Sequence, residues 1–254
     1  MLIDDFINSG KRERDKSGGT KKCFVFDEYV LLYGGFKEEE LQQEMQIGKE
    51  LQILGVQLIP TLEYKVVLPP NELGYSRGYM LQQRAKGTWL YSWGMKEDEY
   101  KQRLSEIAEL GQEKIDKFVS DWMKIIEAGL QVDPSKTENF FYDNGNITFI
   151  DLNLRKVPIN FQYAFWEVTE VLMGLGLKSK EYSNDLAKVI KKVSHSFVKI
   201  GLPLKEISEI ITTKWNYILT ESQVISIMQD LMAEQNKVKT NTPVEFLSKD
   251  GKHL

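Results

Sequence analysis

Two periodicities divide the chain near residue 87. Before that point, short stretches of aromatic and β-branched residues alternate with turns, which is typical of β-strands. These stretches lie at 21–36, 59–70 and 77–85. One helix interrupts them over 37–54, where apolar residues recur at helical spacing until Gly55 ends the pattern. The first part therefore predicts a small sheet with one inserted helix.

After residue 87, apolar residues recur mainly at helical intervals. The expected helical stretches are 97–130, 161–175, 181–200, 204–218 and 221–236. The two ends, 1–17 and 237–254, are polar, so we expect a loosely ordered N-terminal segment and a peripheral tail. The whole pattern predicts an α+β protein with a β-rich N-terminal lobe at 18–86 and a mostly helical C-terminal lobe at 87–236.

The stretch 131–153, QVDPSKTENFFYDNGNITFIDLN, sets polar side chains around a hairpin signal. Two strand-like runs meet at the D-N-G sequence of 143–145, and asparagine followed by glycine favours a two-residue turn because both residues accept positive φ. Such a hairpin returns Asn139 and Asp151 to the same end. We therefore expect these two side chains to lie close together.

The polar residue types of this stretch match the demands of phosphoryl transfer. Transfer needs oxygen ligands for a divalent cation, an acceptor that orients the attacking hydroxyl, and positive charge beside the phosphates. Asp133 could orient the hydroxyl, and Lys136 could neutralise phosphate charge. Asn139 and Asp151 could bind Mg²⁺ from the two sides of the hairpin.

Written as D-x-x-K-x-x-N followed by a hairpin and D-L-N, the stretch resembles the catalytic loop and metal-binding segment of protein kinases, H-R-D-x-K-x-x-N and D-F-G. The resemblance implies a bilobal protein-kinase-like fold that uses ATP and Mg²⁺. It makes Asp133 and Lys136 catalytic and makes Asn139 and Asp151 metal ligands. The K-x-E-N spelling is closer to Ser/Thr protein kinases than to aminoglycoside and choline kinases. Q-V in place of H-R, one added residue before Lys136, and D-L-N in place of D-F-G depart from the motif.

The same resemblance implies nucleotide-binding roles in the first lobe. Gly18 and Gly19 stand where the glycine-rich loop would be, although two glycines also fit an ordinary turn. Backbone groups from Gln82 to Arg84 would bind adenine in the connection between the lobes. Leu81 would then lie near the gatekeeper position.

The lysine that kinases carry on their third strand is missing, since its place falls near Leu32. In with-no-lysine kinases this cation comes from the glycine-rich loop instead, and Lys21 or its neighbour Lys22 could supply it here. Either lysine would pair with Glu44, which resembles the glutamate of the kinase helix C. Alternatively, phosphate handling is lost, and the protein is a pseudokinase that serves as a protein-binding scaffold.

Composition and charge argue against several other classes of function. A net charge of −4 and a pI of about 5.5 argue against nucleic-acid or membrane binding. One cysteine, Cys23, excludes an internal disulfide, and a chain with two histidines offers little for a structural zinc site. No signal-peptide pattern or long apolar run is present, so we expect a cytoplasmic protein, or an effector exported by a route independent of signal peptides.

The acceptor stays open at this stage. A short segment separates Asp151 from the helix near Phe161, and no A-P-E motif follows it. A long, phosphorylation-regulated activation segment is therefore not expected. The first interpretation is a compact atypical Ser/Thr kinase with a protein hydroxyl acceptor and room for a protein activator. The alternative is a small-molecule kinase for an alcohol or an aminoglycoside.

Overall fold

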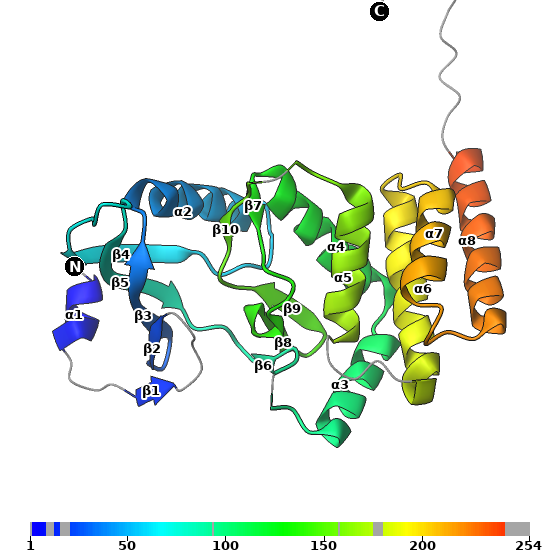
Figure 1. Cartoon of the computed structure of the whole chain (residues 1–254), viewed down its shortest axis with the longest axis horizontal. Coiled ribbons are helices and arrows are strands. Elements are labelled where there is room, and N and C mark those ends of the chain that lie inside the picture. The colour runs from blue at the N-terminus through cyan, green and yellow to red at the C-terminus, as the bar shows by residue number, and fades with distance from the viewer. Residues whose placement is uncertain are drawn as a thin grey trace, which may run out of the picture.

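The protein folds into two lobes that lie side by side (Figure 1). The computed structural model describes residues 2–8, 13–15, 21–92, 94–156, 158–174 and 180–241. The N-terminal lobe holds a five-stranded antiparallel sheet in the order β1-β2-β3-β5-β4. Its strands are β1 (Glu13–Asp15), β2 (Lys22–Val25), β3 (Tyr29–Phe36), β4 (Thr61–Leu68) and β5 (Ser76–Gln83). Its helices are α1 (Leu2–Asn8) and α2 (Glu38–Ile53). The predicted sheet with one inserted helix is confirmed.

The two helices of this lobe pack on opposite faces of the sheet. Side chains alternate along a strand, so neighbouring residues face opposite ways. Leu32 and Met80 pack with Leu41 of α2, whereas Leu31 and Leu81 face α1. The face that packs on α2 also opens toward the C-terminal lobe. Only strand residues that point to this face can therefore contact that lobe.

The helix α1 contradicts the expectation of a loosely ordered N-terminal segment. Ile3, Phe6 and Ile7 recur at helical spacing and pack on the outer face of the sheet, where Ile3 is 2% exposed. A helix of seven residues is not stable alone in water. Its order therefore comes from this tertiary contact, which a local pattern does not reveal. Gly18 and Gly19 lie outside the described residues.

The C-terminal lobe is a helical bundle built around α6. Its helices are α3 (Glu97–Glu109), α4 (Gln112–Glu127), α5 (Phe161–Met173), α6 (Ser183–Lys199), α7 (Leu204–Lys214) and α8 (Glu221–Asn241). A short 3₁₀ turn at Lys180–Tyr182 precedes α6. α6 contacts α3, α4, α5 and α8. The predicted helical stretch 97–130 divides at Leu110 and Gly111, whose extended ψ angles of 141° and 151° interrupt the hydrogen-bond ladder. Within the part of the chain that the structure describes, no helix has the length and apolarity to cross a bilayer.

The predicted hairpin forms between β8 (Phe140–Asp143) and β9 (Asn146–Phe149). Asn144 and Gly145 take φ values of 49° and 81°, which is the two-residue turn that their sequence favours. Three short strands and a 3₁₀ turn complete the region. They are β6 (Thr88–Trp89), β7 (Leu130–Gln131), β10 (Asn153–Leu154) and the turn Thr137–Asn139. β6 pairs with β8, and β7 pairs with β10.

An aromatic cluster holds this hairpin against α4. The Trp122 ring stacks on Phe140 with centroids 5.8 Å apart, and Phe118 stacks on Phe149 at 5.1 Å. All four side chains are buried. Because buried aromatic side chains contribute much of the packing energy of a core, the hairpin is anchored in the core of the C-terminal lobe.

The connection between α2 and β4 ties the two lobes together. Gln57 donates its backbone N–H to Asp121 Oδ2 on α4 at 3.0 Å and accepts from the Phe149 N–H at 2.9 Å. The Ile59 N–H donates to the Phe149 carbonyl, also at 2.9 Å. The hairpin is therefore hydrogen-bonded to the N-terminal lobe just before Asp151.

Candidate active site

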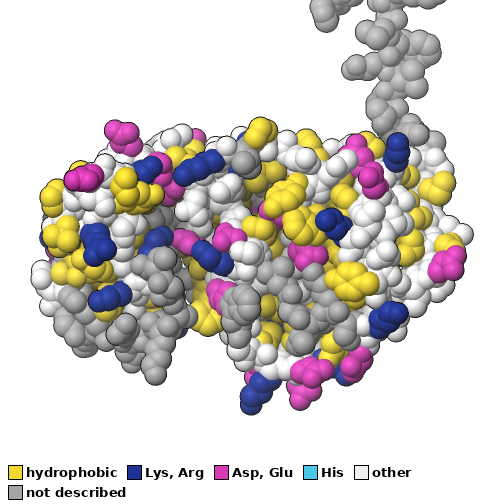
Figure 2. All heavy atoms as spheres, in the orientation of Figure 1, with side chains coloured by type: hydrophobic (Ala, Val, Ile, Leu, Met, Phe, Trp, Pro, Cys, Tyr) yellow, Lys and Arg dark blue, Asp and Glu magenta, His cyan; other side chains and the backbone are white. Residues whose placement is uncertain are grey.

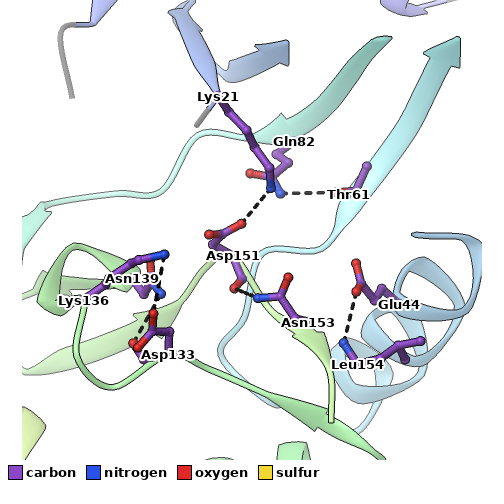
Figure 3. A network of polar contacts seen from close by, with 10 residues as sticks. All are labelled: Lys21, Glu44, Thr61, Gln82, Asp133, Lys136, Asn139, Asp151, Asn153 and Leu154. Atoms are coloured by element: carbon purple, nitrogen blue, oxygen red, sulfur yellow. Dashed lines mark hydrogen bonds and ion pairs between the residues drawn. The ribbon is translucent and has the colours of Figure 1, made fainter. Parts of the chain in front are cut away.

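Charged side chains of both signs gather at the junction of the two lobes (Figure 2). Four predicted site residues from separate segments meet there: Lys21, Asp133, Asn139 and Asp151 (Figure 3). Lys21 lies just before β2, and Asp133 lies in the loop after β7. Asn139 ends the 3₁₀ turn that precedes β8, and Asp151 follows β9. The contacts of each residue show how it is held.

Asp133 is held by the turn that follows it. Its Oδ1 accepts hydrogen bonds from the N–H of Ser135 at 3.0 Å and from the Ser135 hydroxyl at 2.5 Å, and Lys136 Nζ lies 3.4 Å from its Oδ2. Burial raises the pKa of Asp133, but the hydrogen bonds from Ser135 and the charge of Lys136 outweigh it and lower the pKa. The residue added to the kinase motif is taken up in this turn, so Lys136 still reaches Asp133.

Asn139 joins this loop to the end of the hairpin. Its amide Nδ2 donates to the Asp133 carbonyl at 3.3 Å, and its own carbonyl accepts the N–H of Ile150 at 2.9 Å. The side chain is buried, and its Nδ2 contact leaves Oδ1 as the atom that can bind a cation. Asn139 and Asp151 therefore lie at the same end of the hairpin, as predicted.

Asp151 lies where the chain leaves the hairpin, and it has an unusual backbone conformation. Its φ is 53°, in the left-handed region that few residues other than glycine adopt. Its carbonyl accepts the side-chain N–H of Asn153 at 3.1 Å, and its Oδ1 accepts Lys21 Nζ at 2.9 Å. Strained backbone of this kind is common at functional sites, where the surrounding contacts hold it in place.

The structure separates the two candidate lysines. Lys21 precedes β2 and directs its ammonium group to Asp151, and its side chain is 29% exposed. Lys22 is exposed on β2, directly opposite Tyr33 in the strand register. Tyr33 packs with Tyr79 on the face of the sheet that α1 covers, so Lys22 faces away from the site. Alternation along the strand therefore places Lys21 in the site and Lys22 outside it.

Glu44 occupies the site with a different partner from the predicted one. Its Oε1 accepts the backbone N–H of Leu154 at 3.0 Å, whereas Lys21 pairs with Asp151. Among the described residues, no ion pair joins Lys21 to Glu44. Burial raises the pKa of Glu44, because it outweighs the Leu154 hydrogen bond and the charge of Lys21. The Glu44 carboxyl group therefore anchors the segment that follows Asp151.

Two residues of β5 differ from their predicted roles. Gln82 lies in mid-sheet, paired with Val30 and Thr61, so its backbone belongs to the sheet. Its side chain donates to Thr61 Oγ1 at 3.2 Å and lines a cavity of about 20 Å³ with Glu44. Leu81 points to the outer face and packs near α1. Gln82 rather than Leu81 therefore faces the site, because the strand alternates one residue out of step with the prediction.

Arg84 does not offer its backbone N–H to a ligand. That group donates to the carbonyl of Glu28 at 2.8 Å, and the guanidinium group lies 3.4 Å from the carbonyl of Phe26. Both contacts tie the end of β5 to the β2–β3 turn. The backbone of Gln82 and the N–H of Arg84 are therefore engaged within the protein, and the adenine-binding role of this segment stays a prediction.

Sequence reasoning assigned no role to Glu167, which the structure places near Asp133. Burial, and after it the charge of Asp133, raise the pKa of Glu167 to about 7, although a hydrogen bond from Tyr163 acts in the opposite direction. The pKa of Tyr163 is also raised, first by burial and then by Glu167 and Asp133. The helix that carries it, α5, is mostly apolar and also holds a second glutamate, Glu170, so the sequence gives no signal that singles out Glu167.

Glu167→Gln is expected to weaken the pH dependence of stability. The raised pKa stabilises the folded protein fully below about pH 4.5, and this contribution is lost as pH rises through about 7. Because the side chain is half-buried, solvent screening limits the expected change to about 1 kcal/mol. Urea unfolding at pH 5 and pH 8 should show the variant gaining stability over wild type at pH 8. The exposed Glu209→Gln is the control, and equal behaviour of the two variants would contradict the assignment.

The sequence matches no model of a known protein family, and it matches no curated protein. Among solved structures, the chain is similar to the kinase PK-1 of Cydia pomonella granulovirus, with a TM-score of 0.42 and 12% identity over 67% of this chain and 72% of that chain. It is also similar to WaaP, in a structure of its complex with acyl carrier protein. That match has a TM-score of 0.44 and 11% identity, and it covers 89% of this chain and 91% of the other.

The order of the elements agrees with the bilobal, protein-kinase-like arrangement that the sequence predicted. A small antiparallel sheet with one inserted helix precedes a helical lobe, and the two meet beside the hairpin that follows the predicted catalytic loop. The predicted α+β bilobal class is confirmed. A helix of the N-terminal lobe carries a carboxyl group to the segment after the hairpin aspartate, and a lysine of the sheet faces the same aspartate.

Proposed function

We propose that this protein is an ATP- and Mg²⁺-dependent phosphotransferase, a compact atypical kinase that transfers the γ-phosphoryl group of ATP to a hydroxyl. The observation that carries the proposal is the convergence of Lys21, Asp133, Asn139 and Asp151. Lys21 lies more than a hundred residues before the other three, yet one chain of contacts joins all four. Phosphoryl transfer needs these groups together: a cation at the phosphates, oxygen ligands for a metal ion and an acceptor for a proton.

Each residue receives a role from its contacts. Asp133 has a lowered pKa, so it carries the charge that orients the acceptor hydroxyl and accepts its proton. Lys136 is 60% exposed beside it and is free to follow the transferred phosphoryl group. Lys21 supplies positive charge to the phosphates. Glu44 acts indirectly, because it anchors the segment that positions Asp151.

The ligands suit Mg²⁺, which takes few protein oxygens and keeps waters or phosphate oxygens as its other ligands. Asp151 offers a carboxylate that is 37% exposed, and Asn139 offers its Oδ1. Within the described part of the chain, no group of three or more His, Cys, Asp or Glu side chains gathers to form an all-protein site. Bound Mg²⁺ would neutralise phosphate charge between these two ligands.

Adenine would bind to backbone that follows Arg84. The backbone of Gln82 belongs to the sheet and the N–H of Arg84 is taken by Glu28. The connection at 85–87 then leads directly into β6, which pairs with the catalytic hairpin. This connection is therefore the segment that we assign to the adenine edge.

For the acceptor, the K-x-E-N spelling supports a protein hydroxyl. The nine residues 152–160 between Asp151 and α5 leave little room for a substrate platform, which favours a small-molecule alcohol as the second candidate. A pseudokinase scaffold is the third, because β3 lacks its lysine. A protein activator remains part of the proposal, and nothing in the charge of the chain favours nucleic acid or a membrane surface.

Calorimetric titration of the protein with ATP, with and without Mg²⁺, separates these functions. We expect binding that Mg²⁺ strengthens, together with transfer of label from γ-³²P-ATP to the protein itself, to a generic protein substrate or to components of a lysate. A small labelled product would favour the small-molecule acceptor. No metal-dependent ATP binding, together with a tight protein partner, would reject the enzyme in favour of the scaffold.

Lys21→Ala is expected to weaken MgATP binding by roughly 30-fold, about 2 kcal/mol, because a charge-assisted contact to phosphate is lost. Lys22→Ala is the matched control, since its side chain faces away from the site. It should change the dissociation constant by less than about twofold. Calorimetry on the two variants gives the comparison, and equal effects would remove Lys21 from the phosphate site.

A further inference from the structure

The path of Lys21 into the site depends on its strand neighbour. β2 and β3 pair with Lys22 opposite Tyr33 and Cys23 opposite Leu32. The same register puts Lys21 opposite Gly34. From there the lysine side chain extends to Asp151, which its Nζ contacts at 2.9 Å (Figure 3).

Gly34 leaves the space that the stem of this side chain occupies. A Cβ atom added at Gly34 would lie 2.8 Å from Lys21 Cγ, 3.4 Å from its Cβ and 3.6 Å from its Cα. Atoms so near the backbone cannot swing away as the end of a lysine can. Even an alanine at this position would therefore push the lysine stem out of its present course.

The conformation of the backbone does not explain the glycine. Gly34 is in the interior of β3 and is not among the glycines with positive φ, so an alanine would fit its backbone angles. A glycine inside a strand weakens the strand and often marks close approach of another group. Here the approaching group is Lys21, so the requirement is one of space.

Gly34 shares its face with Leu32, the place where a kinase would carry its third-strand lysine. Leu32 packs with Met80 and the residues of α2, which leaves no cation at that point. The side chain of Lys21 has to cross the same face of β3 to reach Asp151. β3 therefore carries no lysine at position 32, and the glycine at position 34 leaves room for the lysine that replaces it.

We propose that Gly34 is a positioning residue for the phosphate-binding lysine: it keeps open the path by which Lys21 reaches Asp151 and bound nucleotide. The inference rests on the proposed function for its effect on ATP. The path itself is a property of the nucleotide-free protein and is tested separately.

Gly34→Ala and Gly35→Ala form a matched pair on adjacent positions of β3. A Cβ atom at Gly35 would lie 3.8 Å from the Ser76 carbonyl, an ordinary contact. We expect Gly34→Ala to weaken MgATP binding about tenfold and Gly35→Ala to change it less than about twofold. Equal affinities in the two variants, with wild type binding normally, would overturn the inference and leave the proposed function standing.

Carbodiimide coupling tests the path without nucleotide. The reagent joins an amine and a carboxylate in contact by forming an amide, and it takes up the water that is lost. In wild type and Gly35→Ala we expect a Lys21–Asp151 cross-link in the peptide mass spectrum, reduced at least about fivefold in Gly34→Ala. An equal yield in all three proteins would overturn the inference. A wild-type protein that cross-links but fails to bind ATP would instead reject the proposed function alone.

A double variant separates a collision with Lys21 from general damage to the strand. Lys21→Ala removes Cγ, the atom nearest to an added Cβ at Gly34. If Gly34→Ala lowers the melting temperature or prevents folding, Lys21→Ala in the same chain should restore it. In the Lys21→Ala background, Gly34→Ala should add no further loss of ATP binding. If Gly34→Ala lowers stability and ATP binding equally with and without Lys21, the substitution acts through a neighbour other than Lys21, and the inference is wrong.

Discussion

Asp151→Asn is expected to lower the rate of phosphoryl transfer by roughly 10³-fold, about 4 kcal/mol of barrier, while the protein stays folded. The substitution removes the charge of the proposed metal ligand and keeps the shape of the side chain. Asparagine also tolerates the left-handed backbone at this position, where φ is 53°. The loss should therefore come from chemistry rather than from the fold.

The same substitution affects one ion pair in the free protein. The Lys21–Asp151 pair has both side chains about one-third exposed, and pairs of this kind contribute about 0–1 kcal/mol. The melting temperature should therefore change little. Steady-state transfer from γ-³²P-ATP and thermal unfolding give the two readouts.

Asp143→Asn is the control for Asp151→Asn. Asp143 lies at the other end of the same hairpin, where its Oδ1 accepts the side-chain N–H of Asn144 at 2.9 Å. Its replacement should leave the transfer rate within about twofold of wild type. Full phosphotransfer by the Asp151 variant would show that the metal ligand has been assigned to the wrong residue.

Asp133→Asn should lower the turnover number by about 10³-fold and leave the affinity for MgATP within about twofold. The lowered pKa of this carboxyl makes it the charged group that faces the acceptor, and an amide cannot accept the proton of the hydroxyl. Within the described part of the chain, the side chain contacts Ser135 and Lys136 and forms no hydrogen bond or ion pair with Lys21 or Asp151. Binding of the nucleotide should therefore survive.

Calorimetry and single-turnover transfer distinguish the two aspartates. Asp151→Asn should lose the strengthening of ATP binding by Mg²⁺, whereas Asp133→Asn should keep it. The result that would contradict this division is loss of metal-dependent binding in the Asp133 variant with normal binding in the Asp151 variant. Asp143→Asn again serves as the control.

Most of the elements could be predicted because their patterns are local. The strands at 21–36 and the helix α2 follow from periods of two and 3.6 residues, which neighbouring residues reveal directly. The helix α1 could not be predicted in the same way, since the sheet face that Ile3 covers belongs to strands far along the chain. The importance of Glu167 was hidden for the same reason, because burial near Asp133 perturbs it.

Which side chains meet in the site depends on the registers of the strand pairs, and a sequence motif does not specify a strand register. The choice between Lys21 and Lys22 follows from the pairing of β2 with β3, and a shift of one residue would exchange their faces. The same one-residue shift separates Gln82, which lines the cavity beside Glu44, from Leu81, which packs near α1.

By itself, the sequence determined that Asn139 and Asp151 lie together, because the turn between them is encoded in adjacent residues whose backbone preferences close it. Only the tertiary structure decided that Lys21 faces Asp151 and that Glu44 binds the Leu154 amide. Those contacts join segments 130 and 110 residues apart. Their geometry is set by how the sheet, α2 and the hairpin pack, and no local preference records that packing.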